Sequence, residues 1–109
     1  MLAAGQLRHR IRLEEPRDVQ DAAGEPVKSW AEIPDGATWA EKRDLSGSEL
    51  VQAQQLNAQV STQFTLRHRK DVDARMRVAH ADALYSIESV QDPDGRRERT
   101  VLLCSRSVN

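Results

Sequence analysis

Two stretches of the chain alternate apolar and polar residues with a period of two. Between residues 7 and 13, leucine and isoleucine fall on one face and three arginines on the other, and a longer alternation runs from residue 58 to residue 67. A period of two is typical of a β-strand that buries one face. Both stretches therefore predict strands, and in the second Phe64 and Leu66 are expected to face the core.

Turn residues divide most of the remaining chain into shorter strands. The segments Pro34–Gly36 and Asp92–Gly95 combine the residue types that favour tight turns. Strands are predicted on either side of these turns, at residues 27–30, 37–43, 84–90 and 97–105. The run Val101–Cys104 is apolar at consecutive positions, so we expect the last strand to be covered on both faces.

The segment from residue 14 to residue 26 has no periodicity of either kind. It is rich in acidic residues and contains Pro16, Gly24 and Pro26. Structureless segments of this length are uncommon in small domains, and they are usually functional or disordered. The sequence therefore predicts a long flexible loop over residues 14–26.

One short helix is predicted by its start signals. Ser46 and Glu49 have the spacing of a capping box, in which each side chain bonds to the other residue's backbone amide. Leu45 and Leu50 have the spacing of a hydrophobic staple around the same residue. We expect a helix over about residues 47–56, with one apolar side packed on a sheet.

These elements predict a mainly β fold for a single domain covering residues 1–109. We expect a small β-barrel or sandwich of about six strands with one short inserted helix. The chain is 39% hydrophobic but only 4% aromatic, so its core must be built from aliphatic side chains. Its formal net charge of −1 disfavours tight autonomous DNA binding, which relies on a clear basic excess.

The sequence predicts no catalytic, metal-binding or cofactor-binding residue. Cys104 is the only cysteine, and the three histidines at positions 9, 68 and 80 lack the spacing of a zinc site. Ser46 is explained by helix capping, and it lacks the glycine pattern of a hydrolase nucleophile. A small hydrolase is disfavoured for that reason. No stretch has the length of a signal peptide or membrane span, so we expect no membrane partner.

The ordered series of segments resembles the phage head-tail joining proteins, also called head-closure or stopper proteins. The resemblance lies in GQLRHRIRLEEP, DVQDAAGEPVKSW, TWAEKRDLSGSELVQAQQLNAQVSTQFTLRHRKDV, MRVAH and ALYSIESVQDPDGRRERTVLLC, which together span nearly the whole chain. One departure is the short hairpin His80–Ala83, where the family often has Asp-Gly.

The resemblance implies a structural protein of the virion neck, assembled in the host cytoplasm. It implies a homo-oligomeric ring between the portal-adaptor protein and the tail proteins. Such a ring helps to retain packaged DNA, which passes through the lumen without sequence-specific binding, and it docks the tail.

Two sets of residues are the candidates for this role. The long loop and the polar side of the helix are expected to contact neighbouring subunits, through Asp18, Gln20, Asp21, Gly24, Gln52, Gln54 and Gln55. Two arginine stripes are expected to face the ring lumen or an acidic partner, and they consist of Arg8, Arg10, Arg12, Arg67 and Arg69. The alternative function is a small OB-like module for single-stranded nucleic acid, which would need several aromatic stacking platforms.

Overall fold

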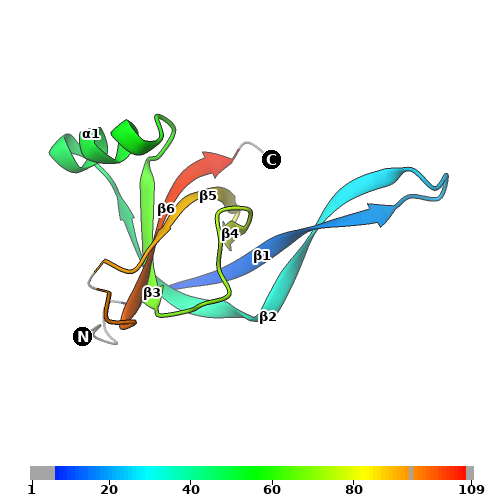
Figure 1. Cartoon of the computed structure of the whole chain (residues 1–109), viewed down its shortest axis with the longest axis horizontal. Coiled ribbons are helices and arrows are strands. Elements are labelled where there is room, and N and C mark those ends of the chain that lie inside the picture. Colours follow the sequence, from blue (N-terminus) through cyan, green and yellow to red (C-terminus); the bar gives the residue numbers. More distant parts are fainter. Residues whose placement is uncertain (1–6, 94, 108–109) are drawn as a thin grey trace.

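The computed structural model describes residues 7–93 and 95–107 of the chain (Figure 1). In this part of the chain six strands surround one core, and a single helix lies outside them. The elements are β1 (His9–Gln20), β2 (Pro26–Asp44), α1 (Gly47–Leu56), β3 (Thr62–Arg67), β4 (Arg77–His80), β5 (Ala83–Gln91) and β6 (Arg99–Ser107). The predicted mainly β fold is confirmed, and the helix has the predicted bounds.

The six strands form one antiparallel sheet that closes on itself. The strand order is β1-β2-β3-β6-β5-β4, and β4 pairs with β1 to complete the barrel. The β1–β4 seam is short, because it joins only Arg12, Leu13 and Glu14 of β1 to β4. Beyond Glu14 strand β1 leaves the barrel, and β2 leaves with it.

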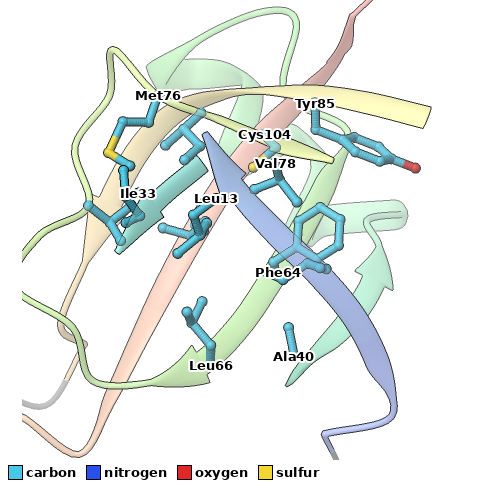
Figure 2. Close-up of a cluster of buried hydrophobic side chains, with 13 residues drawn as sticks. Leu13, Ile33, Ala40, Phe64, Leu66, Met76, Val78, Tyr85 and Cys104 are labelled. Carbon is cyan, nitrogen blue, oxygen red and sulfur yellow. The ribbon is translucent and has the colours of Figure 1, made fainter. Parts of the chain in front are cut away.

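The barrel interior is filled by aliphatic side chains around very few rings, as the composition predicts (Figure 2). Phe64 and Leu66 of β3 are fully buried, so the predicted inward face of this strand is confirmed. The ring of Phe64 packs edge-on against Tyr85, with 5.1 Å between the centroids. Strand β3 begins later than expected, at Thr62, and the buried Val60 belongs to the loop before it.

A second apolar cluster lies on the outside of the barrel, between α1 and β6. It consists of Leu45, Ala53, Val60, Val101 and Leu103, with the partly buried Leu50 packed against it. Strand β6 thus sends alternate side chains into the interior and towards the helix. The prediction that this strand is covered on both faces is confirmed.

The prediction of a long loop over residues 14–26 is wrong. Residues Glu14–Gln20 continue β1 and pair with residues Pro26–Glu32 of β2, so that only residues 21–25 form a turn. The resulting two-stranded ribbon, here called the arm (Glu15–Ala31), projects from the barrel (Figure 1). Neither face of the arm is covered by the core, so its strands carry no apolar alternation. Pro16 is tolerated there because one edge of each strand lies outside the barrel.

The predicted turn at Pro34–Gly36 is a bulge within a single strand of 19 residues. Arg12 pairs with Ala37, whereas Glu14 pairs with Glu32, so four residues of β2 are accommodated opposite Leu13. Asp35 has a φ of 53°, and Gly36 is buried. A Cβ atom at Gly36 would lie 2.8 Å from the carbonyl oxygen of Leu13. The bulge marks the point where β2 passes from the barrel into the arm.

Candidate assembly surfaces

The tip of the arm is a turn organised by one carboxylate. Asp21 Oδ1 accepts hydrogen bonds from the amides of Ala23, at 2.9 Å, and Glu25, at 3.0 Å. The amide of Gly24 donates to the Asp21 carbonyl, and Gly24 has a φ of +82° that favours glycine. Of the predicted contact residues in this region, Asp21 and Gly24 therefore shape the turn, while Asp18 and Gln20 are exposed on its stem.

The arm combines exposed apolar side chains with acidic ones. Val19 and Val27 are paired across the two strands and are 47% and 43% exposed. The arm contains four acidic and two basic residues, and one of the basic residues, Arg17, pairs with Glu15. Neither Asp18 nor Glu25 forms an ion pair with another described residue. The distal half of the arm therefore carries two exposed valines on one face of the ribbon and Asp18, opposite Lys28, on the other face, with Glu25 in the turn.

The base of the arm is held by a cluster of three side chains from three strands. Arg77 of β4 donates from Nε to Glu14 Oε1 at 2.7 Å, and its guanidinium lies 4.3 Å from the centroid of the Trp30 ring. Lys28 lies over the same ring, at 5.4 Å. The Arg77 and Glu14 side chains are only 20% and 14% exposed, so this ion pair is screened less than a surface pair. It fixes the arm to the seam of the barrel.

The outer face of the barrel at the other end of β1 is basic. Arg10 is paired with Trp39 in the neighbouring strand, and its guanidinium carbon lies 5.3 Å from the centroid of that ring. Trp39 is 50% exposed. Together with Leu7, Thr38 and Arg67 it lines a hollow of about 310 Å³. We call the exposed residues Arg10, Arg12, Trp39 and Arg67 the arginine–tryptophan face.

The predicted arginine stripes are thus placed unequally. Arg10 and Arg12 are exposed on one face of the start of β1, Arg8 is exposed just before this strand, and Arg67 is exposed at the end of β3. Arg69 has a different role, because its guanidinium binds Asp71 at 2.8 Å and the carbonyl oxygens of Pro34 and Asp35. Its side chain is only 15% exposed. The two hydrogen bonds to Asp71 also lower the pKa of that carboxyl group.

The helix offers a second polar surface on the opposite side of the molecule from the arm tip (Figure 1). Gln52, Gln54 and Gln55, which the sequence offers as contact residues, are all exposed. Gln54 Nε2 also donates to the Val60 carbonyl at 3.3 Å, so part of its bonding capacity serves the fold. The helix is tied to the sheet by Asn57, which donates to Glu88 at 2.8 Å.

No group of three or more metal-ligating side chains occurs within residues 7–93 and 95–107. The His9 and His80 rings pack edge-on at 5.1 Å, while His68 lies apart from this pair in the loop after β3. Burial, and secondarily the charge of Glu88, raises the pKa of the Cys104 thiol, which leaves it protonated and unreactive. Over the same residues, no helix is long and apolar enough to cross a membrane.

The sequence matches the family described as phage head completion protein over residues 2–107. The chain belongs to this family. Family membership makes it a structural protein of the bacteriophage virion, concerned with joining head and tail. A search of the curated proteins gives no match.

Two solved structures share the fold of this family member. The solution structure of protein SF1141 from Shigella flexneri 2a is 23% identical, with 99% of both chains covered and a TM-score of 0.75. A chain from the virion of a native gene transfer agent particle is 18% identical, with 94% of this chain and 97% of that chain covered and a TM-score of 0.57. At these identities the likeness establishes the fold.

Sequence reasoning found the arginines of β1 but missed their aromatic neighbour. Trp39 falls within the strand predicted at residues 37–43 and was not among the predicted contact residues, although a tryptophan facing the same side as basic residues is a recognisable surface signal. The arm itself was missed because its strands lack a buried face. Its acidic composition was visible, and it is this composition that gives the arm its charge.

Proposed function

We propose that this protein assembles as a ring between the portal-adaptor complex of the phage head and the tail. In that position it helps to retain packaged DNA and provides the surface on which the tail docks. The observation that carries the proposal is the match to the phage head completion family over residues 2–107. A chain of the same fold in a gene transfer agent virion supports it.

The geometry supports assembly through unlike surfaces. A ring requires a heterologous interface, in which two different faces of each subunit meet and the rotation closes. This chain carries three distinct candidate faces: the acidic arm, the arginine–tryptophan face and the polar side of α1. In this proposal, retention of DNA is a mechanical role of the assembled ring and needs no catalytic site. The proposed role is accordingly structural and not enzymatic.

The experiment that tests this role is electron microscopy of particles assembled without the protein. We expect heads that lose their DNA and carry no tails, with both defects restored by supplying the wild-type chain. Normal tailed particles in its absence would contradict the proposal. Nuclease protection of the packaged DNA gives a quantitative second measurement on the same samples.

One observation favours a second candidate, a module for single-stranded nucleic acid. Trp39 is half exposed between arginines, which is the pairing used to stack bases and neutralise phosphates. The other rings do not extend this platform, since Phe64 and Tyr85 are buried and Trp30 is covered by Arg77 and Lys28. Salt-dependent binding of oligonucleotides that is lost in Trp39→Ala would support this candidate. Unchanged tryptophan fluorescence on titration with oligonucleotides would exclude it.

A further inference from the structure

We propose that the arm of one copy of this chain docks on the arginine–tryptophan face of the next copy, and that this head-to-tail contact is the subunit interface. The inference rests on the proposed ring, but it concerns a contact between two copies and is tested on the purified protein. It commits Arg10, Arg12 and Arg67 to an acidic protein partner in place of the ring lumen.

The first argument is complementarity of charge. The arm has four acidic and two basic residues, and Asp18 and Glu25 are exposed without an ion-pair partner among the described residues. Arg10, Arg12 and Arg67 are likewise exposed, and no described carboxylate forms an ion pair with them. Opposite potentials steer two surfaces together and penalise like-charged pairings.

The second argument is complementarity of the apolar side chains on the two surfaces. The paired Val19 and Val27 protrude from the arm, at 47% and 43% exposed. The half-exposed Trp39 lines a hollow of about 310 Å³, which has room for two such side chains. Burial of apolar surface contributes most of the favourable free energy in protein association, and tryptophan and arginine are the residues that most often dominate it.

The third argument is that the two surfaces cannot meet within one chain. Arg10 lies near the start of β1 and Gln20 at its end, ten residues apart along one strand, which corresponds to about 30 Å. Figure 1 shows the strand running from the barrel to the arm tip without turning back. The contact must therefore be intermolecular, and because its two halves differ, it is heterologous and can propagate around a ring.

The fourth argument concerns the edges of the arm. Strand β1 pairs with β4 only as far as Glu14, and β2 pairs with β3 only from Ala40 onwards. Along the arm each strand therefore has one edge that is not bonded to a third strand. Free edges invite pairing with another chain, and natural proteins usually cover or disrupt them. Docking between copies provides such a cover.

Disulfide trapping tests the contact directly, because the natural Cys104 is buried and contributes little background. In the double variant Val19→Cys/Ala37→Cys, which places the second cysteine on the same face of β2 as Trp39, mild oxidation of the purified protein at low salt should give a ladder of covalent dimers and larger species. Val19→Cys/Gln55→Cys, which pairs the arm with the helix, is the matched control and should give at least tenfold less. An absent ladder, or equal ladders in both variants, would overturn the inference.

Charge reversal then tests the chemistry of the contact. Added to the trapping variant, Asp18→Lys/Glu25→Lys or Arg10→Glu/Arg67→Glu should each reduce the ladder about tenfold. Mixing these two reversed proteins should restore it, because every arm then meets a face of opposite charge. Arg96→Glu/Arg97→Glu, an equal charge change in the β5–β6 turn, should have no effect.

Two results of charge reversal would refute the inference. The first is a ladder whose yield does not change when the charge of either surface is reversed. The second is an intact ladder in Arg10→Glu/Arg67→Glu together with loss of DNA from particles that carry this variant, since the face would then bind the nucleic acid. Neither measurement on purified protein depends on whether the particle needs this chain. A failed particle experiment would therefore refute the proposed function without deciding the contact.

Discussion

The guanidinium of Arg77 lies 4.3 Å from the centroid of the Trp30 ring, at the point where the arm leaves the barrel. Arg77 belongs to β4 and Trp30 to β2, two strands that are not neighbours in the sheet. The same arginine donates to Glu14 of β1, which lies between them. One side chain thus connects three strands across the end of the short seam and sets the direction of the arm.

Replacing Arg77 should weaken the whole barrel and not only the arm. In Arg77→Gln, Glu14 loses its partner in a site where both side chains are largely buried. Charge-assisted hydrogen bonds contribute about 1.5–3 kcal/mol, so we expect the free energy of unfolding to fall by about 2 kcal/mol. Urea denaturation measures this change. The matched control is Arg17→Gln, whose exposed pair with Glu15 should be worth less than about 0.5 kcal/mol. Equal losses in the two variants would contradict the assigned role.

Replacing Arg67 or Arg69 with glutamine should change the free energy of unfolding by different amounts. Arg69→Gln removes the hydrogen bonds to Asp71 and to the carbonyl oxygens of Pro34 and Asp35, which join the loop after β3 to the bulge in β2. We expect it to lower the free energy of unfolding by about 2 kcal/mol. Arg67→Gln changes an exposed side chain and should stay within about 0.5 kcal/mol of wild type. Thermal melts of the two variants measure this difference in stability. An Arg69→Gln protein as stable as wild type would show that the loop is held by other contacts.

Strands that bury one face could be predicted from the sequence. The exposed arm, which buries neither face, could not. The alternation around Phe64 and Leu66 gave the inward face of β3 correctly, because burial imposes the period of two. The arm has the same extended backbone conformation but is surrounded by solvent. Its residues therefore show no alternation of apolar and polar side chains. The segment 14–26 was therefore predicted as a loop because it has no periodicity, whereas it belongs to a two-stranded ribbon that lies outside the core.

The start of the helix was predicted correctly, but only one of the two reasons given for it holds. Ser46 is the N-cap residue, yet its side chain makes no capping hydrogen bond, and Glu49 instead pairs with Arg43 at 3.0 Å. Leu45 and Leu50 do belong to one apolar cluster. The helix is thus positioned by packing against β6. Sequence spacing cannot distinguish these two causes, because the same residues satisfy both rules.

Gly36→Ala should disturb the bulge that directs the arm. Its Cβ would meet the backbone oxygens of Leu13 and Ile33 at 2.8 Å and Glu32 Cγ at 2.7 Å, so the backbone must move. Overpacking of this kind costs about 1–3 kcal/mol in the free energy of unfolding. Because Arg69 binds the carbonyls of the same bulge, Gly36→Ala and Arg69→Gln should be non-additive in a double-mutant cycle. Strict additivity would show that the two residues act on separate structures. The pair Gly36→Ala and Arg17→Gln should be additive and serves as the control.

Stability should decline in mild acid, and His9 should be a cause. Partial burial, followed by the charges of His80, Lys42 and Arg8, lowers the pKa of His9 below its ordinary value of 6.5. At a pH between the two pKa values of His9, the unfolded chain binds a proton at this residue and the folded chain does not. The free energy of unfolding is constant with respect to this group above pH 6.5, and it falls as the pH drops from there through the lower folded pKa. Melting temperatures measured between pH 8 and pH 5 should show this fall.

The substitution His9→Gln isolates that contribution. The variant has no proton to bind at this position, so its melting temperature should decline less than that of the wild type between pH 6.5 and pH 5. Both proteins should still lose stability in stronger acid, because Asp71 and Asp73 have lowered pKa values through their pairs with Arg69 and Arg75. A wild-type and a variant profile that run parallel down to pH 5 would exclude His9 as the source of the acid sensitivity.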